Sequence, residues 1–334
     1  MFDIYQAKSL EGKVLKRPLM VVDNLLPAGL TVFAGSPKLG KSWFVLQLCC
    51  CVAEMKPFLG RETAQGGVLY LDLEGSPIRI QDRLSQLGFG FPEYLEIVHK
   101  APKTDNDEFL HCIEDWWSCC SMTPRLIVVD TIARIKGSGK RGQNAYEADS
   151  GIFSPLQEFA LEKGIAIVAV THLKKNDRFS GTEQDWLEKI SGSMGLSGIS
   201  DNVWGLFRKR NSKTAYLRTS SRDVDAGDMV LTFNDGLWTF ESDDLDEYEF
   251  SSRPLVQFIK QLERYSGYAS DLYNRYIAFC GSHKLPHGLS EAKPISSFGI
   301  QMRAVQRESW RFRKTISIYR TKDGQHYEIR KMFD

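Results

Sequence analysis

Short apolar runs alternate with amphipathic stretches from residue 29 to about residue 172. The runs are GLTVFAGS (29–36), GGVLYLDLE (66–74), LEIVH (95–99), RLIVVDT (125–131) and IAIVAVTH (165–172). Nearly continuous apolar runs are typical of strands covered on both faces of a sheet. The segments between them predict helices over 41–55, 76–87, 107–120 and 146–163. This alternation predicts an α/β fold with a mostly parallel, twisted sheet flanked by helices.

The pattern changes after residue 200. Four runs, NVWGLFRK, TAYLRTSS, MVLTFN and GLWTFE, are separated by the turn-like segments NS, DAGD and DG. Closely spaced apolar runs with such turns predict an antiparallel meander.

Residues 241–334 have a third pattern. Residues 241–250 contain six acidic residues in ten, and helical periodicity follows over 254–265, 269–280 and 297–308. Two strands around a DG turn are expected within 314–333. Three helices and a terminal hairpin predict a small winged-helix-like domain.

These patterns divide the chain into four parts. We expect an N-terminal arm (1–22), a large α/β domain (23–241), an acidic linker (242–250) and the C-terminal domain (251–334). Residues 1–250 carry 28 Lys/Arg against 35 Asp/Glu, whereas residues 251–334 carry 15 against 7. A basic segment behind a mildly acidic body indicates an anionic partner for the C-terminal domain.

The composition, 42% hydrophobic and 25% charged residues, is ordinary for a globular protein. No stretch approaches the roughly 20 apolar residues of a membrane span, and the first residues lack the apolar core of a signal peptide. Six of the seven cysteines lie within 49–51, 112 and 119–120, a spacing that does not suit disulfides or a zinc site. The sequence therefore predicts a cytoplasmic protein with reduced thiols and no membrane association.

The segment GSPKLGKS fits the phosphate-binding pattern G-x-x-x-x-G-K-[ST] between a predicted strand and a predicted helix. Backbone N–H groups of such a loop surround phosphates, and the helix directs its positive end at them. Lys41 is expected to reach the β- and γ-phosphates, and the Ser42 hydroxyl to contact Mg²⁺. The predicted nucleotide-binding residues are Gly35, Ser36, Pro37, Lys38, Leu39, Gly40, Lys41 and Ser42.

Polar residues end the other apolar runs. Asp130 is predicted to hold the water shell of Mg²⁺, or else only to cap the next helix. Glu74 is predicted to polarise the attacking water, with Asp72 less favoured; the alternative for Glu74 is an acid at a helix N-terminus. His172 is a candidate sensor of the γ-phosphate, although a histidine at a strand end is often only structural.

Taken together, LLPAGLTVFAGSPKLGKS, YLDLEGSPIRIQDRLSQLG, LIVVDT and VTH resemble the RecA-like P-loop ATPases. Within these, residues 20–241 look most like the RepA- and DnaB-type replicative helicases of plasmids, phages and other mobile elements. The resemblance implies ATP and Mg²⁺ as ligands and catalytic roles for Lys41, Glu74, Asp130 and His172. It also implies that Arg208 and Arg210 reach the site of a neighbouring subunit, with Arg218 and Arg222 in reserve; the alternative is a solvated charged turn.

The resemblance implies an ATP-dependent helicase or translocase that forms a ring, expected to be a hexamer, on single-stranded DNA. Lys174, Lys175 and Arg178 are candidate phosphate contacts in the channel. Arg311 and Arg313 are candidate contacts of the basic C-terminal domain with duplex DNA or a replication partner protein, or else part of a solvated face. One alternative is a DNA-bound regulator or loader that hydrolyses ATP without unwinding. A small-molecule kinase is less favoured, because Glu74 and an arginine from a neighbour suit the activation of water.

Overall fold

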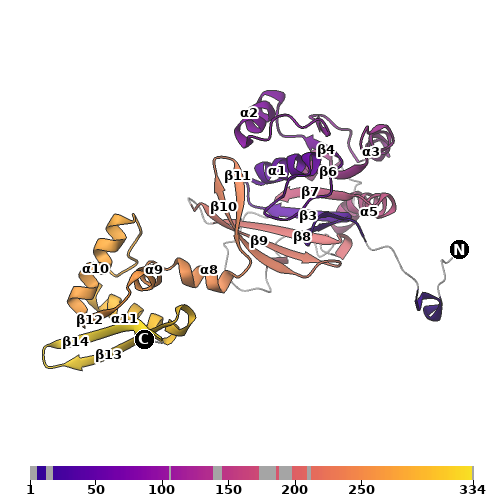
Figure 1. Ribbon diagram of the computed structural model, residues 1–334. Helices are drawn as coiled ribbons and strands as arrows, with labels where there is room; N and C mark the ends of the chain where they lie inside the picture. Colours follow the sequence, from indigo (N-terminus) through magenta and orange to yellow (C-terminus); the bar gives the residue numbers. More distant parts are fainter. Residues whose placement is uncertain are drawn as a thin grey trace. The chain divides into compact units, whose positions relative to one another are not determined.

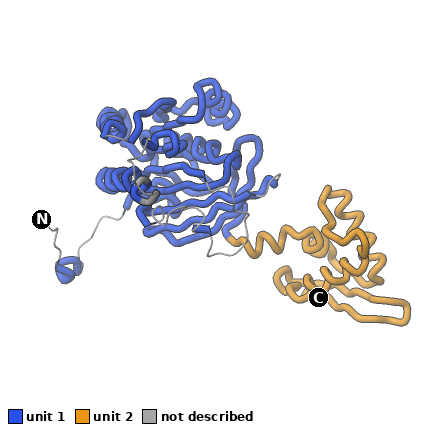
Figure 2. The backbone as a smooth tube through the Cα atoms, turned by 180° about the vertical axis from the view of Figure 1, so that it is seen from behind, with its two compact units in different colours: residues 1–243 blue, residues 244–334 orange. Residues whose placement is uncertain are grey.

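The computed structural model describes residues 6–12, 18–104, 107–137, 145–172, 186–187, 198–208 and 212–332. The chain divides into two compact units, Met1–Asp243 and Asp244–Asp334, which have separate colours in Figure 2. Each unit has its own buried apolar core. The candidate linker (242–250) therefore spans the boundary between the units.

The first unit is built on a nine-stranded sheet with the order β11-β10-β9-β8-β3-β7-β6-β4-β5. Its strands are β3 (Gly29–Gly35), β4 (Gly67–Asp72), β5 (Leu95–Val98), β6 (Pro124–Asp130), β7 (Ala166–His172), β8 (Asn202–Arg208), β9 (Thr214–Ser221), β10 (Gly227–Asn234) and β11 (Leu237–Ser242). The strands from β8 through β3 to β5 are parallel, and those from β8 to β11 are antiparallel. The predicted α/β fold with a mostly parallel sheet is confirmed.

Helices cover both faces of this sheet (Figure 1). One apolar cluster contains residues of α1 (Lys41–Glu54) and α2 (Pro77–Leu87). The other contains residues of α3 (Glu108–Cys119), α4 (Ile132–Ile135) and α5 (Ala145–Lys163). Because both faces are covered, every residue of β3 and β4 is buried, as their continuous apolar pattern predicts. The four helices predicted for this part agree with α1, α2, α3 and α5 to within one residue at each end.

Local signals explain where α2 begins and ends. The Ser76 hydroxyl accepts a hydrogen bond from the backbone N–H of Arg79 at 3.4 Å, and Pro77 occupies the first helical position. Gly88, in the left-handed conformation with φ of 73°, ends the helix. The cysteines of α1 (49–51) are buried and free, and burial raises the pKa of each thiol.

The N-terminal boundary of the first unit differs from the sequence prediction. A short hairpin of β1 (Met20–Val22) and β2 (Leu26–Pro27) packs Val21 and Val22 into the core, so the end of the predicted arm (1–22) belongs to the α/β unit. The helix η1 (Ala7–Leu10) has no buried residue. The antiparallel meander predicted within the α/β domain is present as β8 to β11, and its first strand, β8, pairs in parallel with β3.

Asp201 fixes the point where the antiparallel strands join the parallel ones. Its carboxylate accepts hydrogen bonds from the backbone N–H of Leu30 at 2.9 Å and from Gln157 Nε2 at 2.8 Å. The backbone N–H of Asp201 donates to the carbonyl of Leu30 at 3.0 Å. A Cβ atom on Gly29, whose φ is +123°, would lie 2.7 Å from this carboxylate, so only glycine leaves room for it.

The second unit contains α8 (Leu245–Ser252), α9 (Pro254–Gln261), β12 (Tyr265–Tyr268), α10 (Ala269–Ser282), α11 (Pro294–Arg307), η3 (Ser309–Phe312), β13 (Lys314–Thr321) and β14 (Gly324–Lys331). Its sheet has the order β12-β14-β13. The three predicted helices and the terminal hairpin are present as α9, α10, α11, β13 and β14, with an additional strand, β12, that was not predicted. The winged-helix-like assignment stays a prediction. The helix predicted over 254–265 is too long, because Tyr265 is buried and pairs with Ile329 in the sheet.

The predicted acidic linker (242–250) is largely a helix. The Asp244 carboxylate accepts a hydrogen bond from the backbone N–H of Glu247 at 2.8 Å and caps the N-terminus of α8. Glu247 in turn pairs with Arg311 at 3.0 Å. Asp244 thus caps and Glu247 anchors a helix of the second unit, a role that the prediction of a linker did not include.

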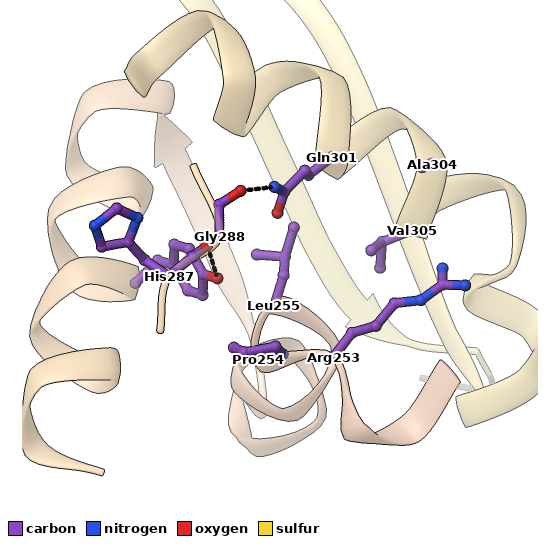
Figure 3. Close-up of a pocket in the computed structure, with 9 residues that line it drawn as sticks. Arg253, Pro254, Leu255, His287, Gly288, Gln301, Ala304 and Val305 are labelled. Carbon is purple, nitrogen blue, oxygen red and sulfur yellow. Dashed lines mark hydrogen bonds between the residues drawn. The ribbon is translucent and has the colours of Figure 1, made fainter. Parts of the chain in front are cut away.

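A pocket of about 250 Å³ lies in the second unit between α9, α10, α11 and the connection at His287 and Gly288 (Figure 3). Two hydrogen bonds form part of its wall. Gln301 Nε2 donates to the carbonyl of Gly288, and the Tyr276 hydroxyl donates to the carbonyl of His287, each at 2.8 Å. These bonds tie the α10–α11 connection to both helices.

In the described part of the chain, no helix combines the length and the apolar character needed to cross a bilayer.

Replacing Asp201 by Ala should lower the free energy of unfolding by about 2–4 kcal/mol, because the buried Leu30 N–H and the Gln157 amide lose their acceptor. Asp223→Ala, on an exposed side chain, is the matched control. Urea denaturation followed by circular dichroism measures both changes. Equal denaturation midpoints for the two variants would contradict the role given to Asp201.

Candidate active site

The phosphate loop connects the end of β3 to the start of α1. Gly35 ends the strand, Lys41 begins the helix, and Gly40 before it is in the left-handed conformation with φ of 99°. A Cβ atom on Gly35 would lie 2.9 Å from the carbonyl oxygen of Leu206, so only glycine fits there without displacement. The remaining predicted loop residues, Ser36, Pro37, Lys38, Leu39 and Ser42, lie between or directly after these positions.

The Lys41 side chain folds back over this loop. Its Nζ donates hydrogen bonds to the carbonyls of Gly35 at 2.6 Å and Ser36 at 3.1 Å. It also lies 3.2 Å from His172 Nδ1, which accepts from the ammonium group. Lys41 is only 5% exposed. Burial lowers its pKa to about 8, although the charges of Asp130 and Glu74 act in the opposite direction.

Asp130 lies at the end of β6, deep in the same edge of the sheet. One carboxylate oxygen accepts a hydrogen bond from the Tyr70 hydroxyl at 3.1 Å, and the Ser42 hydroxyl also bonds to this side chain. Burial raises the pKa of Asp130, and the bonds from Ser42 and Tyr70 act against that shift. The two residues predicted on the Mg²⁺ side of the site, Ser42 and Asp130, are therefore adjacent.

Glu74 follows β4 and is more accessible, with 42% of its side chain exposed. Its carboxylate accepts hydrogen bonds from Arg134 Nε at 3.2 Å and from the Thr131 hydroxyl at 3.4 Å. An exposed carboxylate near the buried Lys41 and Asp130 suits a group that receives a proton from water.

His172 ends β7 opposite Gly35 in the parallel register of β3 and β7. Burial, and next the neighbouring charge of Lys41, lower the pKa of its imidazole. The imidazole therefore stays neutral near pH 7 and keeps Nδ1 as the acceptor for Lys41. This position, in contact with the phosphate-loop lysine, is compatible with the sensor role predicted for His172.

Two further polar residues lie beside the site. Asp72 and Asp130 are opposite each other in the parallel register of β4 and β6. Burial first, and then the charge of Asp130, raise the pKa of Asp72. His99 Nδ1 lies 3.7 Å from Asp72 Oδ2. Asp72 was predicted as a weaker candidate than Glu74. His99 was not predicted as a site residue, and its only sequence signal is its position at the end of an apolar run.

The predicted arginines are distributed differently. The Arg208 guanidinium lies over the Phe233 ring at 5.3 Å, and Phe233 approaches Gly40 of the same chain's phosphate loop. Arg210, Lys174, Lys175 and Arg178 lie outside the described residues. Of the reserve candidates, Arg218 is buried 3.5 Å from Asp228, and Arg222 bonds to the carbonyl of Gly198.

The candidate DNA contacts of the second unit also differ from each other. Arg311 pairs with Glu247 and Glu308 at 3.0 Å each and lies over the Phe250 ring at 4.4 Å. Arg313 is exposed at the start of β13. Arg311 is thus largely engaged within its own unit, which leaves Arg313 as the more accessible of the two.

Residues 6–178, just over half of the chain, match the protein family described as "AAA domain". The chain belongs to this AAA domain family. The family match contains the phosphate loop, Glu74, Asp130 and His172. The α/β unit of the AAA-domain chain is accordingly a P-loop ATPase unit.

Two solved structures are similar to this AAA-domain chain. The ATPase domain of G40P matches with a TM-score of 0.52 and 14% identity over 64% of this chain and 85% of that one. A DnaB-like replicative helicase, whose structure includes its interactions with primase, matches with a TM-score of 0.53 and 14% identity. That match covers 63% of this chain and 58% of the helicase. A search of curated protein sequences gave no match. At this identity the similarity concerns the fold, which is RecA-like.

The pKa of about 8 for Lys41 predicts a pH dependence of nucleotide binding. Phosphates favour the ammonium form, so above about pH 8 the nucleotide-free protein must take up a proton when ATP binds. We expect the affinity for MgATP to be level below that pH and to fall up to about tenfold per pH unit above it. Calorimetry in buffers of different ionisation enthalpy should record an uptake that approaches one proton per bound nucleotide as the pH rises above about 8.

Lys41→Met should remove this pH dependence along with most of the affinity. Lys38→Met, at an exposed position in the same loop, should retain it. A wild-type affinity that does not change between pH 7 and 9.5 would contradict the assignment.

Proposed function

We propose that this AAA-domain protein is an ATP hydrolase that works as a DNA helicase or translocase. The observation that supports it best is the convergence of Lys41, Ser42, Asp130, Glu74 and His172 at one edge of the sheet. Parallel α/β sheets bind ligands at the carboxyl ends of their strands. The buried cation of Lys41 suits a nucleoside triphosphate. The Ser42 hydroxyl and the Asp130 carboxylate suit a metal ion, and the exposed Glu74 carboxylate suits a water molecule.

The residues present fit ATP and Mg²⁺. The glycine loop and the N-terminus of α1 offer backbone N–H groups for the phosphates, and Lys41 adds a positive charge. The Ser42 hydroxyl and the Asp130 carboxylate supply the hard oxygen donors that Mg²⁺ prefers. When bound, Mg²⁺ neutralises charge on the β- and γ-phosphate oxygens.

Hydrolysis requires an activated water. Glu74 accepts a proton from the water while the water oxygen forms a bond to the γ-phosphorus. The bond between the γ-phosphorus and the β–γ bridging oxygen breaks, which gives ADP and phosphate. Arg134 and Thr131 orient the Glu74 carboxylate. His172 contacts Lys41 and is placed to respond to the loss of the γ-phosphate.

A ring oligomer, expected to be a hexamer, would complete this site. Always-charged arginines donated by a neighbouring subunit make hydrolysis depend on assembly. Arg208 and Arg210 are the proposed donors. Arg210 is the favoured one, because Arg208 contacts Phe233, which itself approaches the phosphate loop of the same chain.

Replication of a plasmid, phage or integrated element is the proposed setting. The fold shared with a DnaB-like replicative helicase supports this proposal. Lys174, Lys175 and Arg178 would contact single-stranded DNA, and the C-terminal unit would hold duplex DNA or a replication partner protein. A cytoplasmic location follows from this function.

The basic segment 251–334 favours a second candidate function. Arg303, Arg307 and Arg313 are exposed in this segment. In this candidate, duplex binding through the C-terminal unit is the main DNA contact, and ATP hydrolysis switches assembly or partner binding without strand separation.

A forked-duplex assay with MgATP, combined with size-exclusion chromatography on single-stranded DNA, separates the two functions. For the helicase we expect hydrolysis stimulated by single-stranded DNA, a ring-sized complex and unwinding. Glu74→Gln should bind ATP but lose at least about 100-fold in turnover, and with it unwinding. Glu96→Gln, an exposed carboxylate on β5, is the matched control. A small oligomer that binds duplex DNA and never unwinds it would favour the regulator.

Mixed oligomers test the arginine. Arg210→Ala and Lys41→Ala should each abolish turnover, the first with nearly normal nucleotide binding. Mixing the two variants should restore part of the activity, because an intact phosphate loop then meets an intact arginine from its neighbour. Inactive mixtures that still form hetero-oligomers, or full turnover by Arg210→Ala alone, would contradict donation between subunits.

A further inference from the structure

The hairpin of β10 and β11 contacts the phosphate loop through one tryptophan. Trp238 Nε1 donates a hydrogen bond to the carbonyl oxygen of Gly40 at 3.1 Å. The side chain is 1% exposed, and a Cβ atom on Gly40 would lie 3.0 Å from its ring. Residues 198 positions apart thus meet at the last glycine before Lys41.

Trp238 is itself held to the helix that follows the loop. Gln47 of α1 donates through Nε2 to the Trp238 carbonyl and accepts from the Trp238 backbone N–H, each at 2.9 Å. Gln47 is buried. The centroid of the Phe233 ring lies 4.7 Å from that of the Trp238 ring. The Arg208 guanidinium lies over the same Phe233 ring. The indole therefore has a fixed position relative to the start of α1.

This contact determines the orientation of one peptide group. The Gly40 carbonyl accepts from the Trp238 indole and also from the backbone N–H of Phe44 at 3.0 Å. In a planar trans peptide the next N–H points away from the carbonyl. Holding the Gly40 carbonyl thus directs the Lys41 N–H out of the helix start, where N–H groups bind phosphate.

We propose that Trp238 is a positioning residue for the phosphates of ATP, which it aligns by fixing the Gly40–Lys41 peptide. The inference rests on the proposed ATP binding and assigns to the late hairpin a role in that site. Without the indole donor, the Gly40 carbonyl keeps only the bond from the Phe44 N–H, and a glycine at a φ of 99° has no side chain that further restrains the peptide.

Trp204 provides a matched comparison. It is also 1% exposed, belongs to the same apolar cluster and makes an edge contact with Phe44 at 6.1 Å, as Trp238 does. Replacing either tryptophan by Phe should destabilise the fold to a similar degree, and only Trp238 donates to the phosphate loop.

The test measures ATP affinity and thermal stability of the full chain carrying Trp238→Phe or Trp204→Phe. We expect the Kd for MgATP to rise about fivefold or more in Trp238→Phe, as for the loss of one hydrogen bond, and to stay within about twofold in Trp204→Phe. Both Tm values should fall. Equal affinities of the two variants would overturn the proposal.

Gln47→Leu provides a second test that leaves the indole unchanged. The substitution removes the two hydrogen bonds between α1 and the Trp238 backbone, so the Kd for MgATP should rise as it does in Trp238→Phe. Gln47→Leu therefore tests the proposal even if Trp238→Phe does not fold. Wild-type affinity in a folded Gln47→Leu variant would also count against the proposal. A wild-type chain that does not bind ATP refutes the proposed function instead, whereas normal wild-type binding with unaffected variants refutes the role of Trp238 alone.

Discussion

The central constraint of this protein is a buried ammonium group. Lys41 is held under the surface of the phosphate loop by two backbone carbonyls and an imidazole nitrogen, all neutral groups. Burial of this cation is costly, and it lowers the pKa of Lys41 by more than the charges of Asp130 and Glu74 raise it. An anion that enters the loop adds negative charge beside the ammonium group. The site is therefore built for a phosphate group before any nucleotide is present.

The rest of the fold maintains this arrangement. The parallel strands bring Gly35, Asp130 and His172 to one edge, because both faces of the sheet are covered and the strand register is fixed. Asp201 joins the antiparallel half of the sheet to β3, next to the start of that strand. The hairpin at the far end of that half returns to the phosphate loop through Trp238. Both halves of the sheet therefore contribute to one site.

The two units have different roles in this view. The α/β unit contains the phosphate loop, and the C-terminal unit carries an excess of positive charge, with 15 Lys/Arg against 11 Asp/Glu. Within the C-terminal unit, Glu247 of α8 and Glu308 pair with Arg311, whereas other basic residues stay exposed. Because Arg311 is engaged in these ion pairs, the exposed arginines of the unit are the ones available to an anionic partner.

The sequence alone determined most of the α/β unit. Apolar runs buried on both faces mark strands with little ambiguity, and the loop GSPKLGKS is recognisable because its chemistry depends on consecutive residues. Asp130, Glu74 and His172 were predictable as strand-end residues for the same reason. Only the tertiary structure decided that β8 joins β3, that His99 lies beside Asp72 and that Trp238 holds Gly40. These features are contacts between residues far apart along the chain, and local periodicity carries no information about which distant residues will meet.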